Sequence, residues 1–114
     1  MDSDNLINEG IRRYARMNLD LSVRVFPNVG RMTFARAHDL SCGGMALYVP
    51  LDLELGEVVK VAFELPNSRM QFNVAGAVKN RTGFRYGVEF TKLSHDELRE
   101  IARVTEILSL THQS

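Results

Sequence analysis

The sequence contains a single cysteine, Cys42, and no tryptophan in 114 residues. One cysteine cannot form an internal disulfide, so the fold has to be stable without one, and a chain of this length can bury a sufficient core. The sequence also lacks an apolar N-terminal segment of the kind that forms a signal peptide or a membrane span. These absences predict a cytoplasmic protein with no membrane span.

Neither sign of charge dominates, because 14 basic residues balance 14 acidic ones. A neutral chain lacks the broad positive field that non-specific nucleic-acid binders use, so bulk nucleic acid is not an expected partner and any anion site must be local. The histidines are far apart in sequence, and none has a cysteine at metal-ligand spacing: His38, His95 and His112. Neither a metal nor another cofactor is therefore expected.

Motifs for catalysis are also missing. No glycine-rich phosphate loop precedes a helix, and no serine lies on the strand-turn-helix elbow that is typical of hydrolases. We therefore do not expect an enzyme. A triad assembled from residues distant in sequence would leave no such pattern, so an enzyme stays as the least favoured alternative.

What the sequence does contain is alternation of apolar and polar residues, which begins at Leu19 and recurs in successive runs separated by short turn segments. The residues expected to share inward faces are Leu19, Leu21, Val23 and Val25; Met32 and Phe34; Val59, Val61, Phe63 and Leu65; Met70, Phe72, Val74, Gly76 and Val78; and Phe84, Tyr86, Val88 and Phe90. With a further strand at 45–49, this spacing predicts a meander of six strands that closes as a barrel or folds as a sandwich. Closure would also remove exposed strand edges.

The hydrophobic period changes to that of a helix near residue 94. Ser94 and Glu97 have the spacing of a capping box, and apolar residues then recur at helical spacing at Leu98, Ile101, Ala102, Thr105 and Leu108. The apolar stripe of this helix needs a surface, either the end of its own barrel or a second copy of the chain, so monomer and homodimer are both open. The predicted organisation is an arm at 1–18, a barrel at 19–93, and a helix with its tail at 94–114.

Two short polar clusters remain to be explained. In the first, Arg12, Arg13 and Arg16 place three guanidinium groups within five residues, just before the first strand. The second is the segment DLSCGG at 39–44, which ends one strand and begins another. Each has a plain structural interpretation: solvated charges for the first, and for the second a turn in which side-chain oxygens satisfy local backbone donors.

Together the two clusters match one class of ligand, a cyclic dinucleotide. Arginine pairs bidentately with phosphate, binds guanine O6 and N7 as a fork, and stacks on a base. Asp39 would accept hydrogen bonds from the guanine N1–H and N2–H₂ groups, and Ser41 could donate to a phosphate or accept from a base. A glycine lets the backbone approach the ligand closely.

The order of these motifs resembles that of a PilZ domain. The segment RRYAR at 12–16 is similar to the family's RxxxR motif, and 39–44 to its (D/N)xSxxG motif. The segment YGVEF at 86–90 resembles the strand that commonly closes the family's barrel, and the similarity extends from Ile11 to the final helix. The resemblance implies an all-β fold with a terminal helix: a six-stranded antiparallel barrel plus a C-terminal α-helix.

The resemblance also implies a function, that of a bacterial second-messenger receptor for cyclic di-GMP. The residues that would bind the ligand are Arg12, Arg13, Arg16, Asp39, Ser41 and Gly44, with possible secondary roles for Ile11, Gly43 and Arg81. Ile11 precedes the first motif arginine, where residue type is thought to influence whether one or two ligand molecules bind. Arg81 lies in a stretch where some relatives place an aromatic residue beside a base.

We expect such a receptor to act on an unidentified effector protein, because ligand binding would order the N-terminal arm and create a new surface. The main alternative is a PilZ-like protein-protein interaction module that does not bind nucleotide. A second alternative is a small barrel that binds single-stranded nucleic acid, which the neutral charge does not favour.

Overall fold

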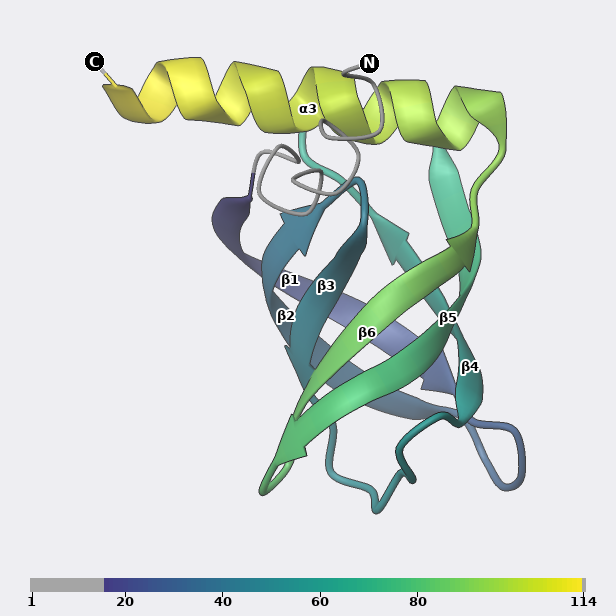
Figure 1. The fold of residues 1–114 in the computed structure, drawn as a ribbon. Helices are drawn as coiled ribbons and strands as arrows, with labels where there is room; N and C mark the ends of the chain where they lie inside the picture. Colours follow the sequence, from purple (N-terminus) through teal and green to yellow (C-terminus); the bar gives the residue numbers. More distant parts are fainter. Residues whose placement is uncertain (1–15, 114) are drawn as a thin grey trace, which may run out of the picture.

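The computed structural model describes residues 16–113. This part of the chain forms six strands and one helix: β1 (Met17–Phe26), β2 (Thr33–Ser41), β3 (Gly44–Tyr48), β4 (Val58–Glu64), β5 (Gln71–Thr82), β6 (Arg85–Lys92) and α3 (His95–Gln113). The strands form a closed antiparallel barrel, and α3 lies across one end of it (Figure 1). The predicted six-stranded barrel with a terminal helix is confirmed.

The order of the strands differs from the simple meander that the sequence predicts. Around the barrel the order is β1-β2-β3-β6-β5-β4, so β3 pairs with β6, and β1 closes the barrel against β4. In a simple meander, β3 would instead pair with β4. The connection at 49–57 runs around the barrel end opposite α3 (Figure 1), and this joins two three-stranded meanders into one barrel.

The barrel interior is filled by the alternating residues that the sequence predicts for most strands. The side chains of Val23 and Val25 in β1, Val59 and Val61 in β4, and other inward residues are almost completely buried: Phe63, Phe72, Val74, Val78, Tyr86 and Val88. The rings of Phe63 and Phe72 stack with their centroids 4.8 Å apart. Each such side chain contributes about 1.5–3 kcal/mol by burial, so this layer is the main source of stability.

Three predicted inward positions are wrong, because Met32, Phe34 and Phe84 are all exposed. Phe34 is 67 % exposed, and the buried residues of β2 are Ala35 and Ala37. Phe34 shares its face with Arg36, and burying a guanidinium costs more than exposing one aromatic ring, so this face turns outward. Phe84 is 53 % exposed because it lies in the turn before β6.

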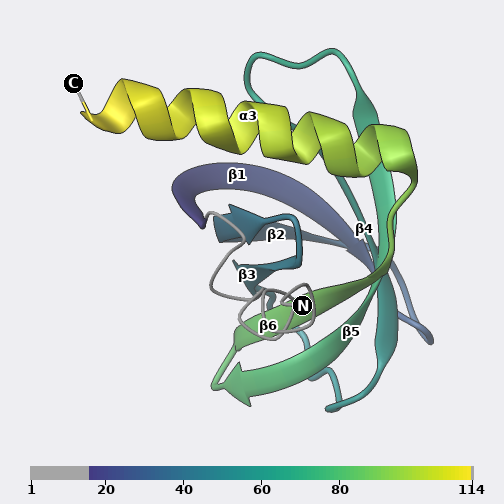
Figure 2. The ribbon, with the colours of Figure 1, turned by 45° about the horizontal axis from the view of Figure 1, so that its top comes forward.

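The helix α3 begins with the predicted capping box. The Ser94 amide donates to the Glu97 carboxylate (2.9 Å), and the Glu97 amide donates to the Ser94 hydroxyl oxygen (3.0 Å). Ile101 and Val104 are fully buried and belong to the same core as the strands. The helix therefore packs on the end of its own barrel, and its C-terminal turns extend past β1 (Figure 2).

The buried stripe of α3 is rotated from the predicted one. Val104 was not part of the prediction, whereas Ala102 is exposed and Leu98 is only partly covered. Thr105 is buried as predicted, and its hydroxyl donates to the carbonyl of Ile101 (2.9 Å), so no polar group is left unsatisfied there. The covered part of the helix therefore centres on Ile101, Val104 and Thr105.

Polar contacts fix α3 to the turn between β4 and β5. The Glu100 carboxylate accepts hydrogen bonds from the Arg103 guanidinium (3.0 and 2.8 Å) and from the Ser68 hydroxyl. The hydrogen bonds from Arg103, and after them the bond from Ser68, lower the pKa of the Glu100 carboxyl group to about 2. Arg103 also donates to the Asn67 carbonyl (2.6 Å).

None of the described helices is both long and apolar enough to cross a membrane.

Replacing Tyr86 by phenylalanine is expected to destabilise the fold by about 1–3 kcal/mol. The Tyr86 ring is fully buried, and its hydroxyl donates to the Leu51 carbonyl (2.5 Å) and accepts from the Leu53 amide (3.0 Å). Losing the hydroxyl leaves both backbone groups without this partner. Urea unfolding measures the effect; Tyr48→Phe, at a half-exposed ring, should shift stability by less than about 0.5 kcal/mol. Equal losses in the two variants would contradict this explanation.

Candidate functional site

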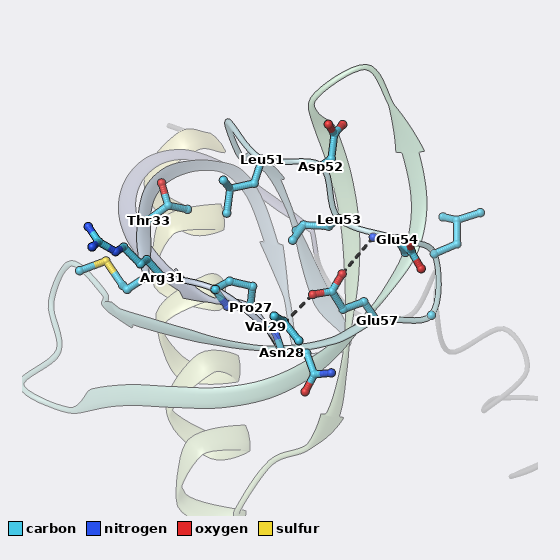
Figure 3. A pocket seen from close by; sticks show the side chains of 14 residues that line it. Pro27, Asn28, Val29, Arg31, Thr33, Leu51, Asp52, Leu53, Glu54 and Glu57 are labelled. Carbon is cyan, nitrogen blue, oxygen red and sulfur yellow. Dashed lines mark hydrogen bonds between the residues drawn. The ribbon is translucent and has the colours of Figure 1, made fainter.

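A pocket of about 750 Å³ lies at the barrel end opposite α3, between the hairpin loop at 27–33 and the connection at 51–57 (Figure 3). Two of its three acidic side chains, those of Glu57 and Asp52, already have partners. The Glu57 carboxylate accepts from the amides of Asn28 (3.2 Å) and Glu54 (3.0 Å), and Asp52 pairs with Arg81 (2.5 Å). These contacts tie two loops together, so we assign this region a structural role despite the size of the pocket.

A second pocket, of about 320 Å³, lies on the outer surface of the barrel over β2, β3, β5 and β6. It brings together five residues that the sequence analysis selected, from both motifs: Arg16, Asp39, Ser41, Gly43 and Gly44. Ile11, Arg12 and Arg13 lie outside the described residues. This pocket is therefore the candidate functional site.

Asp39 reaches the outer surface because β2 contains a β-bulge. Ala37 pairs with Leu47 and Asp39 with Ala46, so His38 is an extra residue in β2. Ala37 is buried, and strict alternation would have turned Asp39 into the core as well. The bulge instead places the carboxylate at the pocket.

The Asp39 carboxylate is only partly satisfied. Its Oδ2 atom lies 3.6 Å from Nη1 of Arg16, while its Oδ1 atom is buried and has no hydrogen-bond partner within the described part of the chain. Buried polar atoms normally have a partner, so this oxygen is available to a donor from a ligand. The Arg16 side chain is 57 % exposed, which leaves its guanidinium open to an anion.

Ser41 combines a structural contact with a free donor. Its side chain is buried, and its hydroxyl oxygen accepts a hydrogen bond from the Gly43 amide (3.0 Å), which is the local turn contact that the sequence suggests. The hydroxyl hydrogen is not used by that contact. The same group can therefore hold the turn and donate to an anion.

Gly44 is required by the close packing of β3 against β6. A Cβ atom at this position would overlap the Val88 carbonyl oxygen and lie 3.1 Å from Cα of Glu89. Gly44 pairs directly with Glu89 in the sheet, so the obstructing atoms are backbone and cannot move aside. The glycine of the second motif thus has a role in folding in addition to any role in binding.

Arg81 lies outside this pocket. Its guanidinium contacts the carboxylate of Asp52 (2.5 Å), the carbonyl of Leu53 (3.3 Å) and the carbonyl of Gly83 (2.6 Å). It also lies near the rings of Phe84 and Tyr86. Arg81 therefore anchors the connection at 49–57 and the β5–β6 turn.

The wall of the pocket opposite Asp39 was not predicted. It consists of residues from β5 and β6, including Lys79, Asn80, Arg85 and Glu89. Lys79 pairs with Glu89 (3.3 Å), whereas no hydrogen bond or ion pair within residues 16–113 engages the side chain of Arg85. The segment at 86–90 marks strand β6 in the sequence. Its place beside the motif residues follows only from the pairing of β6 with β3. Over the same described range, no group of three metal-ligating side chains gathers.

Comparison with known proteins identifies the fold. A family model described as "PilZ domain" matches residues 11–106, and no curated protein sequence matches the chain. Among solved structures, the inhibitor of motility MotI/DgrA from Bacillus subtilis aligns with a TM-score of 0.79 at 16% identity, covering 90% of this chain and 53% of that chain. The present chain thus spans about half the length of that protein.

Two further similar structures contain a ligand. The PilZ domain of YcgR from Escherichia coli, with c-di-GMP, aligns with a TM-score of 0.69 at 18% identity, covering 90% of this chain and 94% of that one. PlzA from Borreliella burgdorferi, in complex with c-di-GMP, aligns with a TM-score of 0.63 at 17% identity, covering 85% and 43%. At these identities the likeness concerns the fold.

Proposed function

The chain belongs to the PilZ domain family, and we propose that it is a bacterial, cytoplasmic receptor that binds cyclic di-GMP in the 320 Å³ pocket on the outer surface of its barrel. PilZ domains are binding modules, so a receptor rather than an enzyme is the natural role. The observation that carries the proposal is the buried, unpartnered Oδ1 atom of Asp39 beside the exposed guanidinium of Arg16. Two proteins of similar fold are complexes with this ligand.

In this proposal Asp39 accepts hydrogen bonds from the N1–H and N2–H₂ groups of a guanine. Arg16 exchanges its long contact with Asp39 (3.6 Å) for a phosphate oxygen. Exposed ion pairs contribute only about 0–1 kcal/mol, so this exchange costs little, whereas arginine and phosphate form strong charge-assisted bonds. The Ser41 hydroxyl donates to a phosphate, and the glycines at 43–44 leave room for the ligand.

Arg12 and Arg13 complete the proposed site from outside the described residues. As the other guanidinium groups of the first cluster, they bind a second phosphate and a guanine face. Ligand binding would then hold the segment at 12–16 against the barrel, and an effector protein would recognise the surface formed in this way. The carboxylate and the three guanidinium groups are complementary to the two guanines and two phosphates of the ligand.

Titration calorimetry of the purified protein with cyclic di-GMP, with GTP and cyclic di-AMP as controls, tests the proposal. We expect selective binding of cyclic di-GMP, and the fitted ratio gives one or two ligand molecules per chain. If folded protein gives no heat and no thermal protection with cyclic di-GMP, the receptor proposal is wrong, and the interaction module without nucleotide binding becomes the better explanation.

Replacing Asp39 by alanine is expected to weaken cyclic di-GMP binding roughly ten- to a hundredfold, because one charge-assisted contact is worth about 1.5–3 kcal/mol. Stability should hardly change, because the variant removes a buried oxygen that lacks a partner. Asp20→Ala is a matched control, since Asp20 pairs with Arg36 (2.6 Å) outside the pocket. Calorimetry on both variants checks the result; similar affinities would exclude Asp39 from the ligand contacts.

A further inference from the structure

Four strands contribute one residue each to a continuous row on the outer surface of the barrel. From β2 through β3 and β6 to β5, the row consists of Asp39, Ala46, Gly87 and Asn80. All four residues line the 320 Å³ pocket. Neighbouring strands lie about 4.8 Å apart, so the row spans about 14 Å. Its two middle residues have the smallest side chains, which makes it a low shelf with a polar side chain at each end.

Asn80 reaches the shelf because β5 has a bulge of its own. Lys79 is an extra residue relative to β6, between Val78 and Asn80. Val78 is buried, so strict alternation would have turned Asn80 into the core. The bulge turns Lys79 and Asn80 outward together, and both are exposed. The two polar ends of the shelf, Asp39 and Asn80, are thus both presented by bulges.

The carboxamide of Asn80 lies close over the backbone of Gly87. A Cβ atom on Gly87 would lie 2.6 Å from Oδ1 and 2.8 Å from Nδ2 of Asn80. The amide can therefore lie here only because residue 87 is a glycine. No hydrogen bond or ion pair in the described part of the chain engages that amide. Its neighbour Lys79, in contrast, is paired with Glu89. The donor and the acceptor of Asn80 are therefore both available at the pocket.

We propose that Asn80 reads a guanine edge at the far end of the shelf from Asp39. This inference rests on the proposed function and extends it to a wall of the pocket that neither motif includes. The carboxamide oxygen accepts from guanine N1–H, while its NH₂ group donates to O6. At the other end of the row the Asp39 carboxylate accepts hydrogen bonds from a guanine, and the small side chain of Ala46 between the two ends leaves room for the ligand.

Calorimetry with cyclic di-GMP tests the inference on Asn80→Ala, with Asn73→Ala as the matched control. Asn73 is an exposed asparagine of the same strand, outside the pocket. We expect Asn80→Ala to bind about three- to tenfold more weakly than wild type, the effect of losing one or two neutral hydrogen bonds, with an unchanged unfolding midpoint. Asn73→Ala should bind like wild type. Equal affinities in the two variants would overturn the inference.

Asn80→Asp separates a base contact from a phosphate contact. A carboxylate still accepts from guanine N1–H and N2–H₂, so this variant should bind within about threefold of wild type. Beside a phosphate, the added charge would repel the ligand, and Asn80→Asp would bind more weakly than Asn80→Ala. That order would also overturn the inference. Absence of binding by folded wild-type protein would overturn the proposed function itself, whereas wild-type binding that is insensitive to Asn80 refutes only this inference.

Discussion

Replacing Arg12 and Arg16 together by alanine is expected to reduce the affinity for cyclic di-GMP at least about a hundredfold. Each arginine is proposed to make a charge-assisted contact worth about 1.5–3 kcal/mol, and every 1.4 kcal/mol is a factor of ten in the dissociation constant. Arg16 lines the pocket with an exposed guanidinium, and Arg12 occupies the other motif position. Calorimetry on the double variant measures the loss.

This loss should not reflect unfolding. The contact of Arg16 with Asp39 is long (3.6 Å) and solvent-exposed on the arginine side, so it contributes little to stability. Arg24→Ala with Arg99→Ala removes the same charge from two exposed positions outside the pocket. The control variant should keep wild-type affinity. If the folded double variant at Arg12 and Arg16 also kept it, the ligand would have to bind away from the proposed pocket.

Salt dependence gives the same prediction a second readout. Guanidinium–phosphate contacts near the surface weaken as ionic strength rises, because the Debye length falls from about 10 Å at 0.1 M to about 3 Å at 1 M. Wild-type affinity should therefore decrease with added salt. Single variants at Arg12 or Arg16 should show a shallower decrease, whereas Asp39→Ala should keep the slope of wild type, because Asp39 is proposed to contact a base.

Much of the fold follows from local pattern in the sequence. Period-two alternation identifies the inward residues of β1, β4 and β5, and the pair Ser94 and Glu97 marks the start of α3. Alternation does not say which strands pair, however. The nine residues at 49–57 are long enough to return to a neighbouring strand or to run around the barrel end, so the pairing of β3 with β6 could not be predicted.

The misplaced core residues show where hydrophobicity alone is insufficient. Phe34 is apolar, but its neighbour on the same face is Arg36, and the charged residue decides which face is outside. Phe84 precedes β6 in a turn, where the Arg81 guanidinium lies 5.6 Å from the centre of its ring. Phe34 is therefore exposed because of the face that it shares with Arg36, and Phe84 because of its position in a turn.

The candidate site was predictable on one wall. Asp39, Ser41 and Gly44 are close in sequence, so a motif can reveal them. Asn80 and Arg85 come from strands that reach the same pocket only through the β3–β6 pairing. The bulge that turns Asn80 outward has no distinctive residue type in the sequence. The wall of the pocket formed by β5 and β6 is therefore determined by strand pairing and by the bulge, which the local sequence does not reveal.

Replacing Gly44 by alanine is expected to destabilise the barrel by about 3 kcal/mol and to lower the unfolding midpoint by about 10 °C. The added Cβ would overlap the Val88 carbonyl oxygen, and the nearby Glu89 Cα is backbone as well, so β3 and β6 would have to separate. This pairing joins the two three-stranded meanders on one side of the barrel, so its loss opens the closed sheet. Thermal unfolding followed by circular dichroism measures the effect.

Gly83→Ala provides the comparison that isolates this clash. Gly83 has a positive φ of 64°, but nothing lies within 4 Å of a Cβ added there, so alanine should cost only about 1–2 kcal/mol of backbone strain. A Gly44→Ala variant no less stable than Gly83→Ala would refute the packing argument. If the predicted order holds, reduced cyclic di-GMP binding by Gly44→Ala would reflect a displaced β3–β6 pair as well as a lost ligand contact. Strand pairing would then explain why the third residue of the second motif is a glycine, whereas Asp39 and Ser41 provide the polar groups of that motif.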